Sequence, residues 1–254
     1  MKIRAIAFNT FKEAIRDRIL YLLLFFAAAC IIFSRLLALL TVGDRVKIIM
    51  DVGLASLSLF GAMMAILMGT GLVYKEIDKK TIYTLLSKPI HRYQFLLGKY
   101  FGLILTLFIM LFFMSFIFLT LVFLHTFRIE WELLIAIFYI FVEVCLLTAV
   151  AMLFSCFSTP ILSLIFSLSF YLIGHLSWGL ENSINKMNPG IAKTLTQILY
   201  AFIPDLENFN FKTEVVHHLP IPSEIFLFSV LYGIFYSLFL LFLAILVFRK
   251  RDFI

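Results

Sequence analysis

Ionisable residues inside the apolar segments are the side chains of this 254-residue chain that are best placed to do chemistry. Glu143 lies near the middle of the apolar segment 133–157. A charge at the centre of a bilayer costs roughly 2.5–3.5 kcal/mol, so we expect Glu143 to face other helices and to have a partner. Arg35 and His175, in the first and fifth apolar segments, are the candidate partners. Two roles stay open for Glu143: contact with a substrate or proton, and a structural hydrogen bond.

The motifs of other chemistries are missing from the sequence. The Gly98-Lys99 pair lacks the upstream glycine and the following Ser or Thr of a phosphate-binding loop. The chain has no H-E-x-x-H and no G-x-S-x-G sequence. The methionines of segment 52–74 and the His217-His218 pair would suit Cu(I), but they belong at different depths, so we predict no metal site. We therefore expect a protein that is not itself an enzyme.

The elements that position these residues are predicted to be membrane-spanning helices. Hydrophobic residues make up 63% of the chain and charged residues 14%, whereas a soluble domain has about a quarter charged. The apolar residues come in blocks long enough for the roughly 20 residues that span a bilayer as a helix. Only helices satisfy their backbone polar groups within one segment in lipid. We expect an all-α polytopic protein with a single transmembrane domain and six spans: about 19–40, 52–74, 100–124, 133–157, 160–180 and 225–248.

Basic residues predict the orientation of these spans. Most Lys and Arg residues lie in segments 1–18 and 75–99 and at the C-terminus, which the positive-inside rule places in the cytoplasm. Apolar residues recur at helical spacing through 1–18, so we expect a basic amphipathic helix in the membrane interface. The long loop 181–224 would then lie outside, where we expect short or re-entrant helices.

Small residues on one face of the second span predict close helix packing. Gly61, Ala65 and Gly69 follow one another at four-residue spacing, which lets two helix backbones approach closely in lipid. The seam could belong to ordinary packing within the bundle or to a dimer, and the first is favoured. Gly98 and Gly102 form one further pair of this kind.

Segment 75–99 combines charge with an apolar pattern. It carries six Lys or Arg residues against two acids, between two apolar spans. Ile77, Leu85 and Leu86 alternate with the charges, and Pro89 would end a short helix and turn the chain back to the membrane. A loop whose charges only set topology would need neither feature. We therefore predict a cytoplasmic helix with a docking face.

The residues of this segment resemble the signature region of ABC-2 type permeases of ABC transporters. The one departure is Lys80, at a position where glycine often precedes the threonine. A second stretch, 203–210, looks like the outer-loop element of the branch that includes the permease of nitrous-oxide-reductase maturation and gliding-type permeases. The matching residues of the first stretch are Glu76, Lys80-Thr81, Leu85-Leu86-Ser87-Lys88-Pro89, Arg92, Phe95 and Leu97-Gly98-Lys99.

This resemblance implies a source of energy outside the chain. The 75–99 helix would be a coupling helix that docks on an ABC ATPase, which would bind ATP and Mg²⁺, so no cofactor is expected in this chain. Glu76 would make a helix-start contact or bridge to a basic group on the ATPase. Apolar residues would fill a groove on the ATPase, and Lys80, Lys88 and Arg92 would lie at its rim or on lipid phosphate. The implied partners are two ATPase subunits, a second permease subunit that is identical or homologous, and membrane lipids, with no nucleic acid.

The same resemblance implies an exporter in the inner membrane of a prokaryote, with both termini in the cytoplasm. Two alternatives stay open. The protein could pass ATPase motion to a partner outside without transporting anything, as a mechanotransmitter or assembly protein. It could also be a proton-coupled secondary transporter that uses Glu143, although the inverted repeats and paired mid-membrane Gly/Pro interruptions of such transporters are not found. No motif names a substrate.

Overall fold

The computed structural model describes residues 2–40, 44–78, 91–177, 190, 193–194, 197, 204–220 and 223–250. Every regular element in these ranges is helical, in agreement with the expected all-α class. The elements are α1 (Lys2–Ile15), α2 (Arg18–Leu40), α3 (Arg45–Asp78), α5 (Arg92–Thr126), α6 (Glu132–Phe157), α7 (Pro160–His175), η1 (Leu206–Phe209), α10 (Lys212–Val216) and α11 (Ser223–Lys250).

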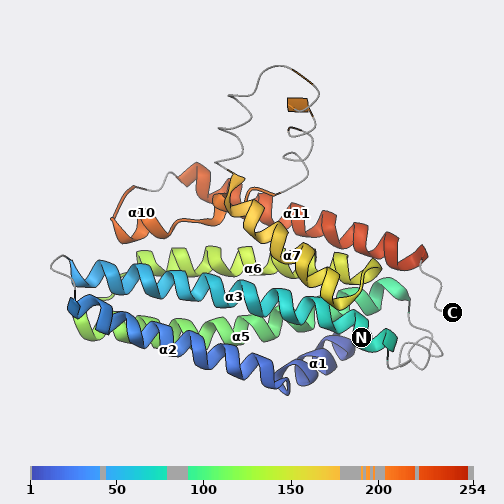
Figure 1. Ribbon diagram of the computed structural model, residues 1–254, viewed down its shortest axis with the longest axis horizontal. Helices are drawn as coiled ribbons and strands as arrows, with labels where there is room; N and C mark the ends of the chain where they lie inside the picture. Colours follow the sequence, from blue (N-terminus) through green and yellow to red (C-terminus); the bar gives the residue numbers. More distant parts are fainter. Residues whose placement is uncertain are drawn as a thin grey trace.

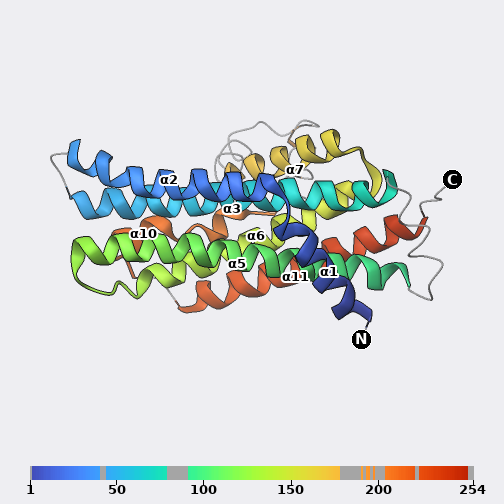
Figure 2. The ribbon, with the colours of Figure 1, turned by 90° about the horizontal axis from the view of Figure 1, so that it is seen from below.

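The long helices α2, α3, α5, α6 and α11 lie roughly side by side along the long axis of the molecule (Figure 1). Helix α3 packs against α6 and α2, and α6 packs against α11 (Figure 2). In their most apolar windows, 61% of α3 and of α6 is buried, against 28% of α2 and α11. The centre of the bundle is therefore the α3–α6 pair, while α2 and α11 offer most of their surface to lipid.

Two ends of the bundle are used as reference points below. The α10 end holds α10 and the connection between α5 and α6, and the α1 end holds α1, the start of α5 and the end of α11 (Figure 1). Helix α3 contains 34 residues and α5 contains 35. Both helices extend beyond the spans expected at 52–74 and 100–124, so the expected 75–99 loop is shorter here, with 79–90 between them.

Among the described residues, five helices are long and apolar enough to cross a membrane, and α7 is not one of them. It starts at Pro160 as expected, because proline suits the first helical position. It ends at His175 after 16 residues, which is about 24 Å of helix against a hydrocarbon core of roughly 30 Å. The expected six-span count is thus not confirmed. The helix ends where Gly174 meets the segment 204–209: a Cβ on Gly174 would lie 2.6 Å from Leu206 Cγ.

The small-residue seam of α3 lies inside the bundle. A Cβ on Gly69 would lie 2.6 Å from Ala151 Cβ, and one on Gly61 would lie 3.1 Å from Val144 Cγ2. Ala65, between the two glycines, is fully buried. The seam therefore packs α3 on α6 of the same chain, which supports ordinary bundle packing over a dimer contact at this face.

Helix α1 crosses the start of α5 at short range. A Cβ on Gly98 would lie 2.7 Å from Ile6 Cβ, and one on Gly102 would lie 2.6 Å from Thr10 Cβ. Thr10 is fully buried beneath this crossing. The N-terminal helix, expected in the membrane interface, is thus packed onto α5 at a pair of glycines four residues apart.

Candidate functional site

Glu143 and His175 form a buried pair where α6 meets the end of α7. His175 Nε2 lies 2.8 Å from Glu143 Oε1, and the Glu143 side chain is only 2% exposed. The apolar α6 sequence fixes the carboxylate in the bundle because its neighbours along the helix are also buried. Of the two partners that the sequence offered, the structure brings His175 to Glu143. Arg35 is exposed on α2 and no contact with Glu143 is found for it.

The second ring nitrogen of His175 faces another carboxylate. Its Nδ1 lies 3.6 Å from Oε2 of Glu207, a residue of η1 whose side chain is 43% exposed. Asn210 Nδ2 donates a hydrogen bond to Glu207 Oε1 at 2.8 Å. The carboxylate of Asp205 caps η1 by accepting from the Glu207 backbone N–H. His175 therefore stands between one enclosed and one accessible carboxylate.

Lys212, the first residue of α10, is the fourth ionisable residue at this site. It interacts electrostatically with both Glu143 and Glu207. Burial lowers the pKa of the Lys212 ammonium below its usual range, and the two carboxylates oppose this effect. We call Glu143, His175, Glu207 and Lys212 the polar cluster. It joins α6, α7, η1 and α10.

Glu207 and Lys212 are functional candidates that the sequence did not single out. They lie in a loop-like stretch between α7 and α11, where no helical or strand periodicity assigns a facing direction. The signal available is indirect, since Asp205 and Glu207 belong to the 203–210 element on which the family resemblance drew. The fold brings that element into the bundle by burying Leu206 and Phe209.

A second set of polar contacts ties the elements at the α1 end. Lys99 on α5 is 2% exposed, and its Nζ lies 3.3 Å from Oε2 of Glu13 on α1. Its ammonium also lies 5.7 Å from the centre of the Phe95 ring, within cation–π range. This ion pair lies beside the glycine crossing, so α1 is joined to α5 by both packing and charge.

Arg92 makes the matching connection to the last helix. Its Nη1 donates to the carbonyl oxygens of Phe248 at 3.1 Å and Arg249 at 2.8 Å. The last carbonyls of a helix have no partner within the helix and carry partial negative charge, so a guanidinium there is favourable. In the structure its Nη1 contacts α11, and its expected position at the rim of an ATPase contact or on lipid phosphate stays a prediction.

The remaining residues assigned to ATPase coupling lie either in the last turn of α3 or in the segment that follows it. Glu76 and Ile77 lie in the last turn of α3. The others lie outside the described residues: Lys80, Thr81, Leu85, Leu86, Lys88 and Pro89. The positions that frame this segment are therefore known, and the proposed docking face itself is not described.

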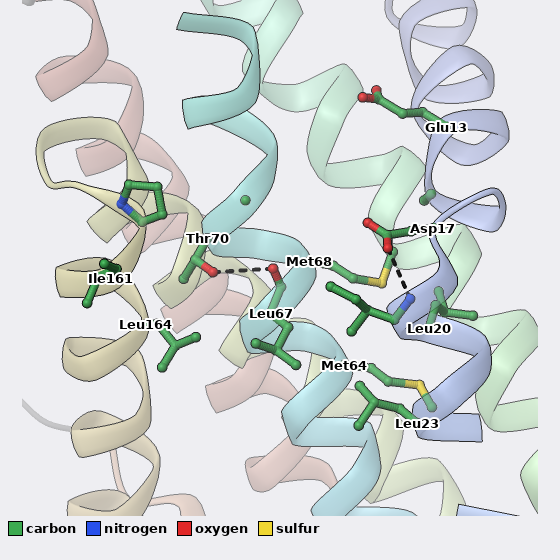
Figure 3. Close-up of a pocket in the computed structure, with 14 residues that line it drawn as sticks. Glu13, Asp17, Leu20, Leu23, Met64, Leu67, Met68, Thr70, Ile161 and Leu164 are labelled. Carbon is green, nitrogen blue, oxygen red and sulfur yellow. Dashed lines mark hydrogen bonds between the residues drawn. The ribbon is translucent and has the colours of Figure 1, made fainter. Parts of the chain in front are cut away.

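A pocket opens between the α1–α2 elbow, α3 and the start of α7 (Figure 3). Its volume is about 280 Å³. Its two carboxylates are engaged within the chain, because Glu13 contacts Lys99 and Asp17 accepts from the Ile19 backbone N–H at 3.1 Å. The pocket therefore favours an apolar occupant. Its apolar walls come from Leu20, Leu23, Met64, Leu67, Met68, Ile161 and Leu164.

Comparison with protein families gives one match over almost the whole chain. A family described as ABC-2 family transporter protein matches residues 4–253. No curated protein matches the sequence. Apart from the first two residues of α1, the matched range includes every described helix, the polar cluster and both connections at the α1 end.

Proposed function

The chain belongs to the ABC-2 family of transporter proteins, and from this premise we propose that it is the permease subunit of an exporter energised by a separate ATPase. The ATPase would bind ATP and Mg²⁺ and would dock on the connection 79–90. Two ATPases and a second permease subunit, identical or homologous, would complete the transporter in the inner membrane of a prokaryote. Both termini would then lie in the cytoplasm with the α1 end.

One observation carries this proposal beyond family membership: α3 and α5 flank the connection as two uninterrupted long helices. The 34 residues of α3 correspond to about 51 Å of helix, well beyond the roughly 30 Å of a hydrocarbon core. A displacement at 79–90 is thus passed along both helices rather than absorbed by a loop. Helix α3 is also half of the central α3–α6 pair, so that motion reaches the core of the bundle.

The contacts at the α1 end extend this transmission to two further helices. Lys99 and the glycine crossing connect α5 to α1, and Arg92 connects α5 to α11. Both connections start within eight residues of each other on α5, directly after the proposed docking segment. The first two turns of α5 therefore support a role as the joint through which ATPase motion enters the permease.

Co-purification with a candidate ABC ATPase that is co-expressed with this chain tests the docking assignment. Leu85→Asp and Glu76→Lys are expected to reduce recovery of the ATPase at least about tenfold, which is about 1.4 kcal/mol of binding free energy. Leu219→Asp and Glu132→Lys are matched controls, since both residues are exposed at the α10 end. If the complex survives both Leu85→Asp and Glu76→Lys, the ATPase does not dock on this segment.

A further inference from the structure

We infer that Glu143, His175 and Glu207 form a proton relay, in which the imidazole passes protons between an accessible carboxylate and a buried one. The inferred ligand of the site is a proton, taken up by Glu143. The inference goes beyond the proposed function, because it concerns the α10 side of the bundle and holds whichever partner drives the permease.

The geometry gives each ring nitrogen of His175 one carboxylate. Nε2 lies within hydrogen-bond distance of Glu143 Oε1, at 2.8 Å. Nδ1 lies 3.6 Å from Glu207 Oε2, beyond a direct hydrogen bond. A rotation of the half-exposed Glu207 side chain or one bridging water closes this gap. The buried carboxylate thereby gains a route to the aqueous phase that its own 2% exposure does not provide.

The transfer balances without any co-reactant. The protonated Glu207 carboxyl gives its proton to Nδ1 as the Nε2–H bond breaks and that proton moves to Glu143 Oε1. One proton leaves Glu207 and one arrives on Glu143, while the imidazole stays neutral and changes tautomer. The reverse transfer restores the first tautomer. Histidine suits this task because both of its nitrogens can donate or accept.

Charged and aromatic groups surround the imidazole on several elements. Lys212 on α10 acts on both carboxylates, and burial lowers the pKa of its ammonium. Tyr171 packs its ring edge to face on His175 at 4.7 Å, which fixes the ring orientation. On the neighbouring elements, Asp205 is hydrogen-bonded to Ser177 and to the Glu207 backbone, and Asp51 of α3 interacts with His217.

The relay links the charge of Glu143 to the solution at the α10 end. With Glu143 ionised, its contact with His175 holds α6 against α7. With Glu143 protonated, the contact becomes a hydrogen bond between two neutral groups, and Leu206 still packs on Gly174. Proton uptake therefore changes the charge at the α6–α7 contact while the segment 204–216 keeps its packing.

Infrared spectroscopy of the full chain in lipid nanodiscs tests the relay. Acid titration is expected to produce a protonated-carboxyl band that Glu143→Gln removes. Exchange into D₂O then measures how fast this carboxyl deuterates. Glu207→Gln keeps the Asn210 contact but cannot pass a proton, and His175→Phe keeps the aromatic packing on Tyr171. Each is expected to slow deuteration of the Glu143 band at least about tenfold.

Glu132→Gln is the matched control, because Glu132 also pairs with a histidine, His218, at 2.7 Å but on the exposed surface. It is expected to leave the exchange rate unchanged. Exchange in Glu207→Gln that is as fast as in the parent protein, or faster, overturns the relay, since protons then reach Glu143 by local opening. The absence of any band that Glu143→Gln removes also overturns it. Glu207→Gln decides the question if His175→Phe fails to fold by circular dichroism.

Discussion

Lys99 on α5 and Glu13 on α1 form an ion pair of 3.3 Å in which the ammonium is buried and the carboxylate is 39% exposed. This difference in exposure decides how much stability is lost when each partner is removed. Water can solvate the carboxylate when the pair is broken, but the ammonium lies inside the protein. The pair therefore holds the lysine in place more than it holds the glutamate.

We predict that Glu13→Gln destabilises the protein more than Lys99→Met does. Glu13→Gln removes the carboxylate that a buried ammonium contacts, at a cost of roughly 1–3 kcal/mol after allowing for exposure. Lys99→Met replaces the lysine by an apolar side chain of similar length, at a cost below about 1 kcal/mol. Denaturant titration of each variant in detergent measures the order, and an equal loss in both would show that the buried charge carries no special penalty.

Gly102→Ala is expected to displace α1 from α5. The added Cβ would lie 2.6 Å from both the Thr10 Cβ and the Ala7 backbone oxygen, and a backbone atom cannot move aside alone. Overpacking of this kind costs about 1–3 kcal/mol. Limited trypsin digestion should then cleave faster at Arg16.

Gly61→Ala is the control for this substitution, because its Cβ would meet only side chains, at 3.1 and 3.3 Å. It should leave cleavage at Arg16 unchanged. Equal cleavage in Gly102→Ala and in the parent protein would show that α1 does not depend on the glycine crossing.

At the polar cluster, we predict a large difference between Glu143→Gln and His175→Ala. The amide of Gln keeps the size of the side chain and can still hydrogen-bond to His175, so we expect a loss below about 1 kcal/mol. His175→Ala leaves a buried carboxylate facing a cavity, which costs roughly 3 kcal/mol. Thermal unfolding in detergent compares the two. A larger loss in Glu143→Gln would mean that the charge itself, rather than the hydrogen bond, holds the site together.

Lys212 gives a pH dependence with a defined sign. Burial lowers its pKa in the folded chain, so the unfolded chain binds the proton more tightly. Stability then rises with pH over the window below the ordinary lysine pKa of about 10.4. Between about pH 8 and 10 the unfolding free energy should rise more steeply in the parent protein than in Lys212→Met. Lys47→Met, which affects a half-buried lysine paired with the exposed Asp44, should keep the parent slope.

The approximate positions of the apolar helices were predictable because each corresponds to a long block of hydrophobic residues. The exact ends of the helices were not. Hydropathy predicts the apolar part of a helix but not its polar ends. It therefore does not predict that α3 starts at Arg45 and α5 at Arg92. The span expected at 160–180 stays a prediction, because α7 is described only to His175 and residues 178–180 lie outside the described chain.

The candidate site was predictable only in part, for a similar reason. The energetic cost of a buried charge indicated that Glu143 needs a partner, and two residues were available. The choice of His175 over Arg35 depends on how the helices rotate about their axes, which the hydrophobic pattern of α2 does not fix, since α2 is apolar on all sides. Glu207 and Lys212 come close to His175 only through the tertiary fold of the segment 204–216, whose sequence has no helical or strand periodicity.

The hydrogen bonds from Arg92 hold the end of α11 against the first turn of α5, directly after the 79–90 connection. The end of α11 can therefore report on binding at that connection. A fluorophore placed in the last turn of α11 sits beside the first turn of α5, although 156 residues separate Arg92 from Phe248 in the sequence. The fluorescence of this label should change when a protein binds the 79–90 connection, even where the label does not contact that protein. The same neighbourhood warns against bulky fusions directly after α11, since they would crowd the entry to α5.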